Sequence, residues 1–519
     1  MKCAIKKIML AVLWSVSLNI SASEKVVITV ADPVPFHIHP QGKAFTIELS
    51  ARSTREGLSV AYYWRDFSGK ALSPLRKLTI NSNQPLRLQS PSSVSGYYGL
   101  VFKPGKYKIQ LNDRWPGEEL VYGFGIGEQN PVPQRSDDLN GRFGTVHTNR
   151  QDPYMPSWIK TMTWKTAQAS EWNKENSSIE QAYFHELPLI IEDEWDSDDR
   201  SPVSLAQLEQ LTRKVTEYFE ADQRIKVWEL GIEENLRDNF KQAYYWDNLS
   251  AKSFAVRQAA DFVNPEIKLI YQIAELEMEP VRLFLNSQAA QNFDILSLHP
   301  YQWPEFAAAE SWLKSYLQAV REEMQLAQQN MPIWFTEVGA PHHGNHPKHF
   351  FGYPINNQEK GVSVQGLTRQ RAAAFMIKVH VVALQEGVEK IFWYNYIDRE
   401  SDRKYAENHF GMIDFWGYPK PVYLAYIAMY SQLKNKKPEG LIPREDDLLI
   451  YVFDDLLETT YVVWKKKNLK DKSSLQVSLS EYNIDLETAI ITDAVGTPYS
   501  LVEGLLDIGE TPLFITRQK

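Results

Sequence analysis

Residues 331–339, MPIWFTEVG, decide the fold, because this run of apolar and aromatic residues ends in a single carboxylate, Glu337. Such a run, bounded by Pro332 and Gly339, is typical of a fully buried strand. A carboxylate at the end of a buried strand is costly unless it faces a solvated or functional cleft. A lone glutamate in this position more often points simply to solvent. Whether Glu337 faces solvent or a functional cleft therefore depends on whether other strands show the same pattern.

Two other stretches have the same form. Residues 225–235 (IKVWELGIEEN) end in the carboxylates Glu233 and Glu234, and residues 295–301 (ILSLHPY) end in a histidine and a tyrosine. Buried strands that carry their polar residues at the C-terminal end are the pattern of a (β/α)8 barrel, whose active site lies at that end. The sequence therefore predicts an α/β chain built on a TIM barrel.

The first 23 residues have the pattern of a secretory signal peptide. Three lysines precede an apolar run at 8–18, and small residues follow at 21–23. The apolar run is too short to cross a bilayer. The only cysteine, Cys3, lies in this segment, so the mature chain would have neither a disulfide nor a cysteine ligand for a metal. We therefore expect a secreted or periplasmic protein without a membrane span.

The charge of the chain bears on its partners. Removing the three lysines of the leader from the 56 Lys and Arg leaves 53 against 65 Asp and Glu, so the formal charge falls from −9 to −12. An acidic chain of this kind argues against nucleic acid and anionic membrane surfaces as partners.

The 519 residues are too many for one core, and three regions differ in pattern. Residues 24–119 contain short alternating runs separated by Pro, Gly, Asn and Ser, which predicts an N-terminal β-sandwich. Residues 120–437 alternate strands with amphipathic helical stretches, which predicts the barrel. Short strands return over 438–519 and predict a small C-terminal β-sandwich. The N-terminal sandwich could bind glycan or only cover the barrel, and we favour the structural role.

Periodicity gives the expected elements of the barrel region. The eight expected strands are 121–127, 141–147, 187–193, 225–231, 268–273, 294–299, 332–336 and 390–394. The expected helices include 204–219, 249–262, 307–328 and 366–385. Ser204 followed by Gln207 fits a capped helix start.

Two carboxylates on strand ends of one barrel are what glycoside hydrolysis needs. Glu337 ends the seventh expected strand, and Glu233 ends the fourth, 104 residues earlier. One carboxyl group must protonate the leaving oxygen, and the other attacks the anomeric carbon when the two lie about 5–5.5 Å apart. Their surroundings should differ, because the acid must keep its proton while the nucleophile stays ionised.

At these points the chain resembles the retaining glycoside hydrolases of clan A. WELGIEEN at 228–235 resembles the fourth-strand motif of the general acid/base, and FTEVG at 335–339 resembles the seventh-strand motif of the nucleophile. HPY at 299–301 is similar to the sixth-strand segment whose tyrosine lies beside the nucleophile, and Trp393 matches the aromatic floor of the −1 subsite. FGMID at 410–414 with PKPVY at 419–423 resembles the tail after the last strand.

The resemblance covers about residues 120–433 and points to the β-xylosidase and α-L-iduronidase branch, without a family assignment. It implies a retaining hydrolase of an oligo- or polysaccharide, with Glu233 as general acid/base, Glu337 as nucleophile, and neither a cofactor nor a metal. The further candidate substrate contacts are His147, Trp195, Asn235, Gln272, His299, Tyr301 and Trp393.

Three questions stay open at this point. Ile232 stands where the clan has an asparagine that hydrogen-bonds the sugar 2-hydroxyl, so the chain could instead be a non-catalytic glycan-binding protein that retains the barrel. The acid could also be Glu234 if the register slips by one residue. Neither the sugar nor the oligomeric state follows from the sequence.

Overall fold

The computed structural model describes most of the chain from residue 25 onward. The described residues are 25–32, 34–53, 57–81, 85–103, 108–111, 120–127, 141–146, 152, 154–155, 158–164, 185–190, 201–221, 223, 225–236, 240–302, 308–342, 350–353, 362–399, 406–443, 447–466, 474–479, 484, 486 and 488–519. The signal peptide expected at 1–23 lies outside them. The chain divides into two compact units, Met1–Gly127 and Glu128–Lys519.

The N-terminal unit contains two sheets, with strand orders β6-β3-β1-β8 and β2-β9-β7-β4-β5. Its elements are β1 (Lys25–Ala31), η1 (Pro35–His37), β2 (Ile38–Pro40), β3 (Thr46–Ser53), β4 (Leu58–Asp66), β5 (Arg76–Ile80), β6 (Leu86–Gln89), β7 (Gly96–Lys103), β8 (Lys108–Leu111) and β9 (Leu120–Gly127). Ile47, Leu49 and Ala51 are buried on alternate positions of β3, as expected of a sheet with one face on a core. The expected all-β character of this region is observed.

The barrel strand predicted at 121–127 is wrong, because β9 belongs to the N-terminal unit. It pairs antiparallel with β7, from Gly96 opposite Ile126 to Phe102 opposite Leu120, and parallel with β2. Its place in the barrel is taken by β11 (Trp158–Trp164), which the sequence analysis did not predict. A short apolar run reveals a strand but not the sheet that it joins. The first compact unit accordingly ends at Gly127, after β9.

The second unit is built on a closed barrel of eight strands in the described part of the chain. Neighbouring strands are parallel throughout. Apart from β11, the strands are β10 (Phe143–Val146), β12 (His185–Ile190), β13 (Val227–Leu230), β14 (Lys268–Ala274), β15 (Ile295–His299), β16 (Ile333–Val338) and β19 (Lys390–Trp393). Every residue of β13, β15 and β16 is buried, because a parallel sheet is covered on both faces.

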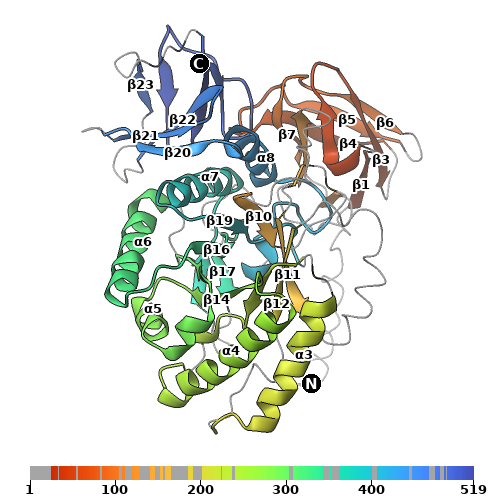
Figure 1. Ribbon diagram of the computed structural model, residues 1–519. Helices are drawn as coiled ribbons and strands as arrows, with labels where there is room; N and C mark the ends of the chain where they lie inside the picture. The colour runs from red at the N-terminus through yellow and green to blue at the C-terminus, as the bar shows by residue number, and fades with distance from the viewer. Residues whose placement is uncertain are drawn as a thin grey trace, which may run out of the picture. The chain divides into compact units, whose positions relative to one another are not determined.

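Helices lie outside the barrel strands, as Figure 1 shows. They are α3 (Leu205–Ala221), α4 (Ala243–Val263), α5 (Met278–Leu285), α6 (Ala309–Leu326), α7 (Arg369–Gln385) and α8 (Pro421–Leu433), with short 3-10 turns at η4 (Glu234–Leu236), η5 (Gln288–Asn292) and η6 (Ala406–His409). The capped start expected before α3 is present: Ser204 N donates to Gln207 Oε1, and Gln207 N donates to Ser204 Oγ.

Beyond the barrel, the C-terminal strands form a five-stranded sheet in the order β20-β21-β22-β26-β24 and a two-stranded sheet β23-β25. A hairpin, β17 (Phe350–Tyr353) with β18 (Val362–Gln365), precedes α7. The C-terminal strands are β20 (Lys437–Leu441), β21 (Leu448–Asp454), β22 (Glu458–Lys465), β23 (Leu475–Val477), β24 (Ile490–Thr492), β25 (Leu506–Ile508) and β26 (Leu513–Gln518). Residues from both sheets share one core, including Ile450, Val463 and Ile508.

The C-terminal strands β20, β21 and β22 contact the barrel unit through α7. The Gln385 side chain donates to Val452 O and accepts from Gly440 N, and the ammonium of Lys378 lies over the ring of Trp464. This explains why the region expected as a separate domain from 438 belongs to the same compact unit as the barrel.

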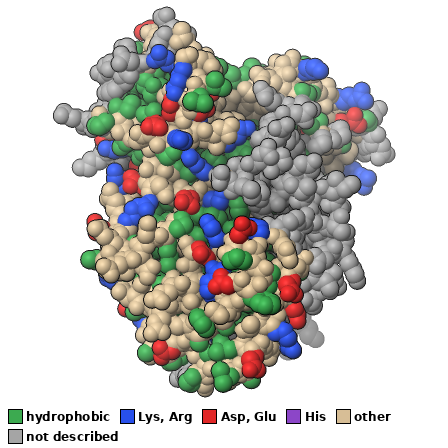
Figure 2. Space-filling model, viewed as in Figure 1, with side chains coloured by type: hydrophobic (Ala, Val, Ile, Leu, Met, Phe, Trp, Pro, Cys, Tyr) green, Lys and Arg blue, Asp and Glu red, His purple; other side chains and the backbone are tan. Residues whose placement is uncertain are grey.

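The described residues also show how charge is distributed on one face and whether a helix could cross a membrane. Acidic and basic side chains are interspersed on the face seen in Figure 2, and no continuous basic patch is visible among the described residues there. Within the described residues, each helix is either too short or too polar to cross a membrane.

Candidate active site

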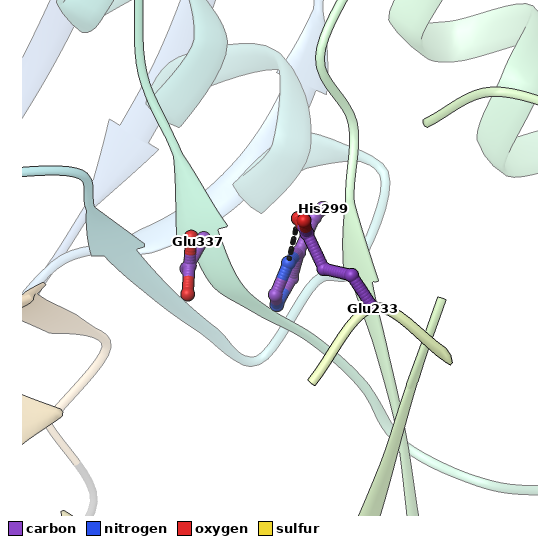
Figure 3. Close-up of side chains that lie close together, drawn as sticks. All are labelled: Glu233, His299 and Glu337. Carbon is purple, nitrogen blue, oxygen red and sulfur yellow. Dashed lines mark hydrogen bonds and ion pairs between the residues drawn. The ribbon is translucent and has the colours of Figure 1, made fainter. Parts of the chain in front are cut away.

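Three strand ends bring the candidate catalytic residues together at the C-terminal mouth of the barrel. Glu337 is the penultimate residue of β16, His299 ends β15, and Glu233 follows β13 (Figure 3). A carboxylate oxygen of Glu233, one of Glu337 and a ring nitrogen of His299 lie within 4.8 Å of one another. Of the described acidic residues, these two are therefore placed to act on one bond.

A tight turn after β13 directs the side chain of Glu233 toward His299 on β15. Gly231 and Glu233 both have left-handed backbone angles, with φ of 72° and 46°. Glycine adopts this conformation freely, whereas a glutamate in it is strained and is characteristic of functional sites. Asn235 anchors the turn to β14, because its Oδ1 accepts from Ala274 N at 2.8 Å and its Nδ2 donates to Ala274 O at 3.0 Å.

Glu337 is buried in a surrounding that keeps it ionised. Lys160 Nζ lies 2.9 Å from its Oε1, and the Tyr301 hydroxyl donates to its Oε2 at 3.2 Å. Burial acts to raise the pKa of Glu337, but the charge of Lys160, with the hydrogen bonds from Lys160 and Tyr301, outweighs it and lowers the pKa below its ordinary value. An ionised carboxylate is what a nucleophile requires.

Lys160 on β11 is shared between two carboxylates. Its Nζ lies 2.6 Å from Glu229 Oε2 as well as 2.9 Å from Glu337 Oε1, and the lysine is fully buried. Burial alone would lower the pKa of Lys160. The charges of Glu229 and then Glu337 raise it by more than burial lowers it, so the net shift is upward. Neither Lys160 nor Glu229 was predicted from the sequence as a site residue. The signal available was a lysine inside the alternating run WIKTMTW at 158–164.

His299 bridges the acid and the strand of the nucleophile. Its Nδ1 lies 2.9 Å from Glu233 Oε1, and its Nε2 lies 2.8 Å from Thr336 Oγ1. Glu233, His299 and Glu337 are residue types that also bind metals. Both ring nitrogens of His299 are already in hydrogen bonds, however, so a cation would have to displace one of them.

Two tyrosines and a third carboxyl group line the same end of the barrel. Burial and then Glu337 raise the pKa of Tyr301 well above its ordinary value, so this phenol is a stable donor to the nucleophile. The Tyr301 ring meets that of Tyr394 edge to face at 6.4 Å, and the Tyr394 hydroxyl donates to Glu407 Oε2 at 2.8 Å. Burial, with the nearby charges of Glu337 and Glu233, raises the pKa of Glu407. Sequence reasoning missed Tyr394 and Glu407.

Trp393 does not form the floor of the site, contrary to the prediction. Its ring lies 6.1 Å from those of Phe375 and His380 on α7, between the barrel and its helices. Successive side chains of a strand point to opposite faces, so the residue that reaches the site is the next one, Tyr394. The predicted floor was therefore one residue out of register.

Of the other four candidate substrate contacts, Gln272 and Asn235 lie among the described residues. Gln272 is buried and donates to Gly231 O, and its Oε1 has no hydrogen-bond partner among the described residues. The amide of Asn235 is hydrogen-bonded at both ends to the backbone of β14, which anchors the turn after β13, and its substrate contact stays a prediction. His147 and Trp195 lie outside the described residues.

Glu234, the alternative acid, lies away from the nucleophile. It is buried near Tyr271, whose pKa is raised mainly by burial and also by the charge of Glu234. The Tyr271 ring stacks on Phe284 of α5, outside the barrel strands. Of the two neighbouring glutamates, Glu233 is the one that meets His299 and Glu337.

Gly339 allows the strand of the nucleophile to pass close to the end of β19. A methyl group at this position would overlap the backbone carbonyl oxygen of Tyr394. We expect Gly339→Ala to lower the stability of the chain by about 3 kcal/mol, since backbone cannot yield as a side chain does. Urea unfolding would measure the loss. Gly509→Ala is the matched control, because a methyl group there has open space; equal effects of the two substitutions would contradict the expectation.

Several solved structures are similar to this chain to different degrees. A family 39 glycoside hydrolase from the gut symbiont Bacteroides cellulosilyticus aligns over 94% of this chain and 99% of its own, with a TM-score of 0.63 and 15% identity. A β-glucuronidase from Bacteroides uniformis aligns over 96% and 59%, with a TM-score of 0.38 and 10% identity. A family 30 subfamily 8 xylanase from Clostridium acetobutylicum aligns over 73% and 96%, with a TM-score of 0.43 and 8% identity.

The first of these likenesses shows a common fold, which is the fold expected from the resemblance to clan A glycoside hydrolases. No protein-family model matches the chain, and no curated protein sequence matches it.

Proposed function

We propose that the chain is a retaining glycoside hydrolase that cleaves an oligo- or polysaccharide through a covalent glycosyl-enzyme intermediate. The observation that carries the proposal is the separation of Glu233 and Glu337, whose nearest oxygens lie within 4.8 Å. Retaining enzymes hold their carboxyl groups about 5–5.5 Å apart, whereas inverting enzymes need about 6.5–9.5 Å to admit a water molecule. The (β/α)8 barrel would carry this site, with the N-terminal β-sandwich and the C-terminal strands as structural additions.

The two carboxyl groups take different roles in the reaction. Glu337 attacks the anomeric carbon while Glu233 gives its proton to the leaving glycosidic oxygen, which breaks the glycosidic bond. Glu233 then removes a proton from water, which attacks the same carbon and releases Glu337 with retained configuration. The lowered pKa of Glu337 supports its assignment as the nucleophile. The barrel chemistry requires no cofactor, and the N-terminal pattern at 1–23 supports a secreted or periplasmic site of action.

Product stereochemistry tests the proposal. The mature chain should release a reducing sugar from some member of a panel of aryl glycosides and polysaccharides, and NMR should show the first-formed product with the anomeric configuration of the substrate. We expect Glu233→Gln to lower the rate by about 10²–10⁴-fold on substrates with poor leaving groups. An inverted first product would refute the assignment of Glu337 as nucleophile.

A non-catalytic glycan-binding protein is the second candidate, and Ile232 is the residue that favours it. The aliphatic side chain next to Glu233 cannot donate a hydrogen bond to a sugar hydroxyl. Retained glycan binding without turnover on the same panel would support this candidate. Gain or improvement of turnover in Ile232→Asn would locate the deficiency at this residue.

A further inference from the structure

A chain of hydrogen bonds and one ion pair joins the two candidate catalytic carboxyl groups inside the barrel. Its links run from Glu337 to Lys160, Glu229, Thr336, His299 and Glu233. The side chains come from four different strands and the turn after β13, so the chain crosses the barrel interior. Because each group has a known number of protons and lone pairs, the direction of its hydrogen bonds can be assigned.

Thr336 sets these directions. Its hydroxyl has one proton and two lone pairs, and it has three neighbours: Glu229 Oε1, Ser297 Oγ at 2.6 Å and His299 Nε2 at 2.8 Å. Glu229 is paired with Lys160 and, as a carboxylate, can only accept. The proton of Thr336 therefore goes to Glu229, and Thr336 must accept from Ser297 and from a proton on His299 Nε2.

The protonation state of His299 then decides where the proton of the acid lies, because an imidazolium would donate from Nδ1 to a carboxylate of Glu233, whereas the neutral form that the relay requires cannot. A neutral imidazole with its proton on Nε2 has a lone pair on Nδ1, and Nδ1 lies 2.9 Å from Glu233 Oε1. A carboxylate would meet that lone pair unfavourably, whereas a carboxylic acid donates to it. We propose that the relay from Glu229 through Thr336 to His299 holds the proton on Glu233, so that Glu229 and Thr336 are positioning residues for the general acid.

The groups that face Glu233 agree with this arrangement. Apart from His299, the described groups within electrostatic range are Glu337 on β16, Glu275 after β14, Glu407 on η6 and the phenol of Tyr301. A negative charge on Glu233 would therefore lie among other carboxyl groups. The inference rests on the proposed hydrolase function, since it explains how that site keeps its acid protonated between turnovers.

Two variants interrupt the relay in different ways. Thr336→Val removes the hydroxyl with little change in volume, which leaves His299 free to place its proton on Nδ1. Glu229→Gln reverses the relay: Lys160 can only donate, so the amide oxygen must face it and the amide nitrogen must face Thr336. Thr336 would then donate to His299 Nε2, and an Nδ1 proton would stabilise the carboxylate of Glu233.

Both variants should shift the alkaline limb of the pH dependence of kcat/KM to lower pH by about one unit. Ser297→Ala is the matched control, because it removes another buried hydroxyl bonded to Thr336 without changing the direction of the relay. An alkaline limb that stays in place in Thr336→Val and Glu229→Gln, or that moves equally in Ser297→Ala, would overturn the proposal.

A second measurement needs no turnover and separates this inference from the proposed function. In protein labelled with ¹⁵N-histidine, with the His299 signals assigned through His299→Asn, NMR should show an unprotonated Nδ1 and a protonated Nε2 near neutral pH. Thr336→Val should change that pattern toward a protonated Nδ1. A wild-type His299 protonated at Nδ1 would overturn the relay even in an active enzyme, whereas the expected tautomer in a protein without turnover would overturn only the hydrolase function.

Discussion

Replacing Glu337 by glycine should lower hydrolysis by at least about 10⁴-fold, and added azide should restore turnover while producing a glycosyl azide of the opposite anomeric configuration. The substitution leaves Lys160 Nζ and the Tyr301 hydroxyl, which now contact the two oxygens of Glu337, around an empty space at the position of the nucleophile. A small anion can occupy that space beside Lys160 and attack the anomeric carbon from the same face. Chromatography and NMR of the product would measure both effects.

Two comparisons make this experiment specific. Glu337→Gln fills the same space with an amide, so it should lose activity without rescue by azide. Glu233→Gln should still form the glycosyl-enzyme from aryl glycosides whose leaving group needs no protonation, but it should hydrolyse that intermediate slowly, because the same residue is the base of the second step. Turnover of Glu337→Gly at the wild-type rate without azide would show that another group is the nucleophile.

Much of the barrel could be predicted from the sequence, because buried parallel strands and amphipathic helices have distinct periods. The strands that end in Glu233, His299 and Glu337 were found within a few residues of their observed bounds. Two errors remained: the strand at 121–127 was assigned to the barrel, although β9 pairs with β7, and β11, which pairs within the barrel, was not predicted as a strand.

Some residues of the candidate site could be predicted from the sequence and others could not. Residues at strand ends could be found from the sequence, since a polar residue after an apolar run stands out. Lys160 and Glu229 could not, because each lies inside a strand and is tolerated there only through a partner more than 60 residues away. Trp393 and Tyr394 show the remaining difficulty, since aromatic residues side by side in a strand point to opposite faces and composition does not say which one faces the site.

Lys160→Met should have the largest effect on stability, because it leaves two buried carboxylates, Glu229 and Glu337, without their shared cation. Breaking a buried ion pair by removing one partner costs about 3–5 kcal/mol. The variant should also lose activity at neutral pH: without Lys160, burial would raise the pKa of Glu337, and less of the nucleophile would be ionised. Urea unfolding and the acid limb of the pH dependence of kcat/KM would measure the two effects.

The sign of the pH dependence should reverse between the two proteins. In the wild type, the lowered pKa of Glu337 contributes stability that is present above its ordinary value of 4.5 and is lost as pH falls toward the lowered value. In Lys160→Met, Glu337 with a raised pKa would contribute stability at low pH that is lost as pH rises. Adding Glu229→Gln should recover part of the lost stability by removing one uncompensated charge. Simple additivity of the two substitutions would show that Lys160 and Glu229 do not stabilise each other, and the shared cation would then serve Glu337 alone.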